Sequence, residues 1–130
     1  MAKILIVDDS GYARRVHRGI LESGGHSVIE SATGMGAIEQ YFLEHPDAVL
    51  LDLSMADMGG ADVLARLQEL DATSRVIVIS ADVQRTTEQA VMAAGARRFV
   101  GKPADAAKLL QTVNEVLAIE PPAETRPPLR

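Results

Sequence analysis

Residues 48–55 of this 130-residue chain read Ala-Val-Leu-Leu-Asp-Leu-Ser-Met, and this stretch decides the fold. Its first four residues are apolar without interruption, which is typical of a strand buried on both faces of a parallel sheet. The run ends in a carboxylate, Asp52, at the start of a loop. A charge at the end of a buried strand is costly unless it is paired or used. The stretch therefore predicts a central strand with a functional acid at its carboxyl end.

The rest of the chain predicts an alternation of strands and helices around this central strand. Further strands are expected at about residues 4–7, 27–31, 75–80 and 97–101. Helices are expected at about residues 10–23, 33–44, 60–70, 83–94 and 104–118. Strands that alternate with helices indicate a parallel sheet covered on both faces, and right-handed crossovers then give a doubly wound α/β fold.

The apolar periodicity of the helices indicates which side chains face the core. These are Ala13, Val16 and Ile20 in the first helix, Ala37, Ile38, Tyr41 and Phe42 in the second, Val63, Leu64, Leu67 and Leu70 in the third, and Leu109, Leu110, Val113, Val116 and Leu117 in the last. The helix at 83–94 is rich in alanine and has few large apolar side chains, so we expect it to be weakly held.

Composition narrows the classes of function. Only 3% of the residues are aromatic, which argues against a base-stacking surface or an aromatic-lined ligand pocket. The formal net charge of −5 disfavours nucleic-acid binding, because the cations that neutralise phosphates are lacking. Without cysteine there is no disulfide or thiolate chemistry. The apolar run near the N-terminus is too short for a signal peptide or a membrane span, so we expect a soluble, cytoplasmic protein without a membrane partner.

The C-terminal residues differ in composition from the rest of the chain. Residues 119–130 hold four of the six prolines and show no apolar periodicity. We therefore expect a folded domain over residues 1–118, followed by a flexible tail or a truncated linker. The chain is then either a protein that ends in a loose tail or a piece of a longer one.

Polar side chains follow four of the predicted strands, where each strand ends. They are Asp8 and Asp9 after the first, Asp52 at the end of the third, Ser80 at the end of the fourth and Lys102 after the fifth. Taken singly they are weak signals, since acids often cap helices and loop lysines are often solvated. The carboxyl ends of parallel strands meet at one edge, where ligands bind in open sheets. We therefore expect one site.

This set of residues favours phosphoryl transfer to a carboxylate. Three crowded carboxylates repel one another unless a cation intervenes, and Mg²⁺ or Mn²⁺ suits their hard oxygen ligands. Asp52 is then the nucleophile that accepts the phosphoryl group. Lys102 and the hydroxyl of Ser80 would neutralise the charge on the transferred oxygens.

Taken jointly, the motifs resemble the receiver domain of two-component response regulators. They are Val7-Asp8-Asp9-Ser10, Leu51-Asp52-Leu53-Ser54-Met55, Met58-Gly59-Gly60, Ile79-Ser80-Ala81 and Lys102-Pro103. The resemblance covers about residues 3–118. It implies a flavodoxin-like fold with strand order 2-1-3-4-5 and a signalling protein rather than an enzyme. It also implies that Asp52 accepts phosphate from a sensor histidine kinase or a phosphotransfer protein.

The resemblance also assigns ligands for the metal. Asp9 and Asp52 would bind Mg²⁺ directly, together with the backbone carbonyl of Ser54, whereas Asp8 would act mainly through water. The same family usually has a cis Lys–Pro bond, so the bond between Lys102 and Pro103 is expected to be cis.

The remaining implied roles concern switching and the lifetime of the phosphoryl group. Ser80 and Phe99 would form a switch pair that changes the face made by the fourth helix, fifth strand and fifth helix. Phe99 lacks the hydroxyl of the tyrosine that many members carry, and a plain core role for it stays open. Ser54 and Asp82 would flank the path of the hydrolytic water.

Partners and alternatives complete the expectations. The resemblance implies an unidentified downstream effector and allows a phosphorylation-dependent homodimer, without direct contact to nucleic acid. A pseudo-receiver that is never phosphorylated is an alternative, although the presence of all five site residues argues against it. A flavin carrier would need a phosphate-binding loop where this chain has Asp8 and Asp9. A phosphatase with an aspartyl nucleophile would need a cap domain and a different aspartate spacing.

Overall fold

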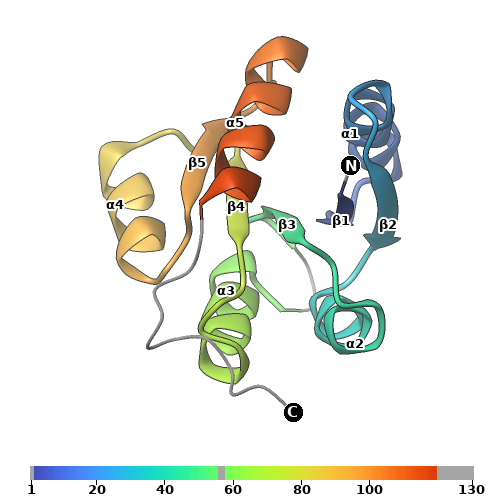
Figure 1. The fold of residues 1–130 in the computed structure, drawn as a ribbon. Helices are drawn as coiled ribbons and strands as arrows, with labels where there is room; N and C mark the ends of the chain where they lie inside the picture. Colours follow the sequence, from blue (N-terminus) through green and yellow to red (C-terminus); the bar gives the residue numbers. More distant parts are fainter. Residues whose placement is uncertain (1, 56–57, 120–130) are drawn as a thin grey trace.

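The computed structural model describes residues 2–55 and 58–119. Its strands are β1 (Lys3–Val7), β2 (Ser27–Ser31), β3 (Ala48–Asp52), β4 (Val76–Ser80) and β5 (Arg98–Gly101). Its helices are α1 (Gly11–Ser23), α2 (Gly34–Glu44), α3 (Gly60–Leu70), α4 (Arg85–Ala93) and α5 (Ala106–Ala118). The strands form one parallel sheet in the order β2-β1-β3-β4-β5, which confirms the predicted fold (Figure 1).

The sheet separates two apolar clusters. Helices α1 and α5 cover one face, and α2, α3 and α4 cover the other (Figure 1). Alternate residues of one strand enter opposite clusters: Ile4 and Ile6 of β1 face α1 and α5, whereas Leu5 and Val7 face α2 and α3. Each such fully buried side chain stabilises the fold by about 1.5–3 kcal/mol relative to an exposed one. The three central strands are therefore fixed in position from both sides.

Side chains at the helix starts set the helix bounds. The hydroxyls of Ser10 and Thr33 accept the backbone N–H groups of Ala13 and Gly36, at 3.1 and 2.9 Å, and so cap α1 and α2. The carboxylate of Asp105 caps α5 in the same way. This helix therefore begins at Ala106, two residues later than predicted.

The predicted inward faces are right in part. In α1 the buried residues are His17 and Leu21, whereas Val16 is 41% exposed. Apolar periodicity alone passed over His17 because histidine is polar, although its position one turn before Leu21 aligns the two residues. Phe42 and Leu70 are also largely exposed, at the outer edges of the apolar arcs of α2 and α3.

Helix α4 has few buried side chains, as predicted, and that it is weakly held stays a prediction. It begins at Arg85 and ends at Ala93, and Val91 is its one buried residue. The predicted tail starts at residue 119, and residues 120–130 lie outside the described part of the chain. Among the described residues, no helix combines the length and the apolar character needed to cross a membrane.

Candidate functional site

The parallel register brings the predicted site residues to one edge of the sheet. Leu51 of β3 lies opposite Val7 of β1, and Ile79 of β4 lies opposite Asp52. Ser80 lies opposite Gly101, directly before Lys102. The strands therefore end at nearly the same level, and their polar side chains converge as predicted.

Lys102 joins two buried carboxylates. Its Nζ donates to Oδ2 of Asp8 at 3.0 Å and lies 3.1 Å from Oδ1 of Asp52. Asp8 and Asp52 are only 1% and 4% exposed, so water screens this charge cluster poorly. Burial would lower the pKa of Lys102, but its hydrogen bonds to the two carboxylates outweigh burial and raise it. The ammonium group therefore stays charged at neutral pH.

The surroundings of Asp52 disfavour its charged form. Burial raises the pKa of its carboxyl group, and the charge of Asp8 acts in the same direction. The hydrogen bond from Lys102 and the backbone N–H of Ser54 offset this only in part. The negative charge on Asp52 therefore carries a free-energy cost, which a bound cation or the neutralisation of the carboxylate would lower.

The acidic cluster fits a divalent cation. Carboxylate oxygens of Asp8, Asp9 and Asp52 lie within 4.8 Å of one another. With Lys102 included, these groups still carry a net negative charge. The donors are all hard oxygens, which suits Mg²⁺ or Mn²⁺. The backbone N–H of Ser10 donates to Oδ1 of Asp8 at 2.9 Å and so fixes the direction of this carboxylate. Asp9 is exposed, so its carboxylate is accessible to an ion from solvent.

Leu53, directly after Asp52, is held against the start of α3. The backbone N–H of Gly60 donates to the carbonyl of Leu53 at 3.0 Å. A Cβ atom at position 60 would collide with the backbone of Asp52 and Leu53, so glycine is needed for this close approach. Ser54, two residues after Asp52, is exposed, and its predicted place beside a water path stays a prediction. Whether its carbonyl binds metal stays a prediction.

The residues after β4 form a chain of hydrogen bonds that reaches α4. Oγ of the buried Ser80 accepts the backbone N–H of Asp82 at 3.0 Å. The carboxylate of Asp82 accepts the backbone N–H of Gln84 at 3.1 Å and the hydroxyl of Thr87 at 2.8 Å. These two bonds lower the pKa of Asp82, in that order of importance. Asp82 therefore anchors the start of α4, a contact that its predicted position beside the water path did not suggest.

Phe99 lies one strand away from Ser80. It is partly buried and packs against the apolar cluster beneath α2, α3 and α4, opposite Val78 in register. The backbone N–H of Lys102 donates to the carbonyl of Ser80 at 2.8 Å, which links the ends of β4 and β5. The bond between Lys102 and Pro103 is cis, as predicted. The switch role of Ser80 and Phe99 stays a prediction.

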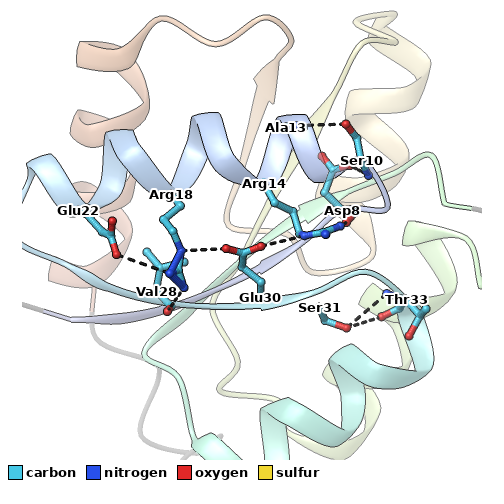
Figure 2. A network of polar contacts seen from close by, with 10 residues as sticks. All are labelled: Asp8, Ser10, Ala13, Arg14, Arg18, Glu22, Val28, Glu30, Ser31 and Thr33. Carbon is cyan, nitrogen blue, oxygen red and sulfur yellow. Dashed lines mark hydrogen bonds and ion pairs between the residues drawn. The ribbon is translucent and has the colours of Figure 1, made fainter.

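The sequence analysis missed a residue that supports the site. Nη1 of Arg14 donates to the backbone carbonyl of Asp8 at 2.7 Å, and its Nε donates to Glu30 at 2.9 Å (Figure 2). In a helix with several basic residues, Arg14 looks like an ordinary solvated charge. The one available signal is that Arg14 and Arg18 are four residues apart and so share a helix face.

The comparisons with known proteins agree on the family to which this chain is similar. A family model described as the response regulator receiver domain matches residues 4–114. The chain is 35% identical over 116 residues to the chemotaxis protein CheY of Bacillus subtilis, covering 88% of this chain and 97% of that protein. It is 36% identical over 120 residues to Protein PilH of Pseudomonas aeruginosa, covering 91% and 99%.

Solved structures agree as well. The CheY-like response regulator receiver domain protein of Methanospirillum hungatei superposes with a TM-score of 0.84 at 26% identity, covering 90% of this chain and 94% of that one. The Vibrio cholerae chemotaxis protein CheY4 gives a TM-score of 0.84 at 25% identity, covering 89% and 98%.

The open parallel sheet with this strand order, the acidic cluster at its carboxyl edge and the similarity to known proteins together indicate a domain of the CheY-like class. The chain belongs to the response regulator receiver domain family. Members of this family are signalling proteins rather than classical enzymes, and they take phosphoryl groups from kinases and act on downstream partners. They normally bind Mg²⁺ at an acidic pocket, and the cluster of Asp8, Asp9 and Asp52 is the pocket that corresponds to it here.

Proposed function

We propose that this protein is a phosphorylation-activated switch in which Asp52 accepts a phosphoryl group from a sensor histidine kinase or a phosphotransfer protein. The observation that carries the proposal is the contact of one ammonium group, Lys102, with two buried carboxylates at 3.0 and 3.1 Å. Burial also raises the pKa of Asp52, and titratable groups with shifted pKa values cluster at functional sites. The proposal places this reaction in the cytoplasm.

The residues present support a mechanism in which charge is neutralised around the acceptor. A carboxylate oxygen of Asp52 attacks the phosphorus of the donor, and the bond from phosphorus to the donor breaks. Lys102 is placed to pair with one phosphoryl oxygen as a compact point charge. The Ser80 hydroxyl accepts from Asp82, so its own proton is free to donate to another oxygen. Asp8, Asp9 and Asp52, with the Ser54 carbonyl, would hold Mg²⁺, which supplies further neutralisation when bound.

The proposed output runs from Ser80 to α4. Movement of the Ser80 hydroxyl toward a phosphoryl group would break its bond to Asp82, whose carboxylate holds the start of α4. Phe99 would then fill the space that Ser80 vacates. Helix α4 buries one residue, Val91, fewer than the other four helices, so we expect it to resist displacement least among them. The resulting change in the face of α4, β5 and α5 would recruit an effector or a second copy of the chain.

The organisation of related proteins leaves two forms of the chain open. The sensory/regulatory protein RpfC of Xanthomonas campestris is 36% identical over 118 residues, yet this chain spans only 16% of its length. CheY of Bacillus subtilis is instead matched over 97% of its length. We propose that residues 119–130 form a tail or linker, and that the receiver acts through a separate protein or through an attached domain.

Incubation with acetyl phosphate and Mg²⁺ tests the proposed function. We expect stoichiometric, hydroxylamine-sensitive phosphate incorporation that is lost when EDTA removes the metal, because the acidic cluster then repels the donor. Beryllofluoride with Mg²⁺ should shift backbone amides over residues 80–102 in an NMR spectrum. A protein that takes up no phosphate would support the pseudo-receiver instead, and shifts limited to residues beside the metal would contradict a propagated switch.

We also propose that Asp82 lengthens the lifetime of the phosphoryl group. Its carboxylate is engaged by Gln84 and Thr87 and its pKa is lowered, so it would be a poor general base and would hold water away from the phosphorus rather than activate it. Asp82→Ala should therefore speed autodephosphorylation by about threefold, the size of effect expected for one exposed polar group. The matched control is Thr87→Val, which loosens α4 but keeps the charge. An unchanged rate in Asp82→Ala, or an equal rise in both variants, would contradict this role.

A further inference from the structure

A chain of polar contacts leads from the middle of β2 to the loop that carries the candidate metal ligands (Figure 2). Arg14 and Arg18 of α1 lie on either side of Glu30, with Nε atoms at 2.9 and 2.8 Å from its two carboxylate oxygens. Arg18 is itself held by the backbone carbonyl of Val28, at 2.8 Å from its Nη2. Glu30 is therefore fixed by two cations, one of which is tied to β2.

The guanidinium group of Arg14 also contacts the loop that carries Asp8 and Asp9. Its Nη1 donates to the backbone carbonyl of Asp8 at 2.7 Å, a short bond that a charged donor makes strong. This carbonyl belongs to the peptide that joins Asp8 to Asp9, so its direction sets where both carboxylates lie. The Arg14 side chain is 21% exposed, which limits the alternative positions open to it.

We infer that Arg14 is a positioning residue for divalent cation binding, which orients the peptide between Asp8 and Asp9 while Glu30 holds its guanidinium in place. The inference deepens the proposed function and rests on it, because it assumes that this acidic cluster binds the metal. Outer contacts of this kind fix the direction of metal ligands, and their loss typically weakens metal binding 10- to 100-fold.

The direction in which Mg²⁺ affinity changes when Arg14 is removed distinguishes a positioning role from a purely electrostatic one. Arg14 is a cation near a cation site, so by electrostatics alone its removal should tighten Mg²⁺ binding. Loss of positioning should weaken binding. Arg15 provides the baseline, because it follows Arg14 in the sequence, carries the same charge and is exposed. Its side chain makes no contact with Asp8 or Glu30 among the hydrogen bonds and ion pairs of the described residues.

The test is a Mg²⁺ titration of the full 130-residue chain, in which amide shifts in NMR spectra and calorimetry measure binding. We expect Arg14→Met to weaken Mg²⁺ binding by about tenfold. Arg14→Lys should also weaken it severalfold, since a lysine cannot reach a carboxylate and a carbonyl at once. Arg15→Met should stay within about twofold of the parent or bind slightly tighter. Equal or tighter binding by Arg14→Met would overturn the inference.

A second readout does not depend on the metal. In metal-free protein, the amides of Asp9 and Ser10 should exchange with deuterium several times faster in Arg14→Met than in the parent or in Arg15→Met. Glu30→Gln releases Arg14 without touching Asp8 and should show the same changes at smaller size, which keeps the test decisive if Arg14→Met does not fold. A parent chain that binds no Mg²⁺ would overturn the proposed function as well, whereas an Arg14→Met variant that matches the parent would overturn only this inference.

Discussion

Asp52→Asn is expected to abolish phosphate uptake and at the same time to stabilise the metal-free protein. An amide oxygen is a poor nucleophile, so incorporation from acetyl phosphate should fall by more than about 100-fold. Because burial and the charge of Asp8 raise the pKa of Asp52, its ionised form is costly in the fold. A neutral side chain of the same shape should raise the free energy of unfolding by about 1 kcal/mol. Phosphate labelling and urea unfolding in EDTA measure the two effects.

The matched control for this substitution is Asp62→Asn. Asp62 also lies near Asp52 in the sequence, in the first turn of α3, but its side chain is exposed. Removal of its charge should leave phosphate uptake unchanged and shift the free energy of unfolding by less than about 0.5 kcal/mol. Phosphate uptake by Asp52→Asn at the parental rate would place the acceptor elsewhere. A less stable Asp52→Asn protein would mean that the ionised carboxylate contributes more through Lys102 than it costs.

The fold and the acidic site could be predicted from sequence because both follow from local patterns. Apolar runs such as 48–51 must lie in the sheet, and parallel strands leave their terminal residues on one edge. Asp8, Asp52 and Lys102 could therefore be brought together without knowledge of side-chain positions. The strand order itself came from the resemblance to a family, since alternating strands and helices fit several orders.

What the sequence analysis missed depends on which polar side chains face each other. The partners of Arg14 and Asp82 are set by rotamers and by the distance between α1 and β2 or between the end of β4 and α4, and periodicity contains neither. The buried His17 was missed for a related reason. It occupies a core position that an apolar residue would normally mark, so a pattern search assigned that face to Val16 instead.

Lys102→Met is expected to destabilise the metal-free protein strongly at neutral pH. The substitution keeps most of the unbranched apolar stem of the side chain but leaves Asp8 and Asp52 buried side by side without their cation. Loss of one member of a buried charge cluster costs about 3 kcal/mol in the free energy of unfolding. Mg²⁺ should restore part of this loss and should bind the variant more tightly than the parent, because the ammonium group no longer competes for the same two carboxylates. Urea unfolding with and without Mg²⁺ measures both effects.

The pH dependence of this variant has a definite sign. Lys102 lowers the pKa of Asp52, so without it burial and the charge of Asp8 would raise the folded-state pKa of this carboxyl further above the unfolded value of about 3.9. Proton binding then favours the folded state, so the loss of stability should be largest near pH 8 and should shrink as the pH falls toward about 5. Lys108→Met, which removes an exposed lysine of α5, should show neither the loss nor its pH dependence. A deficit in Lys102→Met that stays constant over this range and does not respond to Mg²⁺ would show that packing, and not the pairing of charge, is what Lys102 contributes to the site.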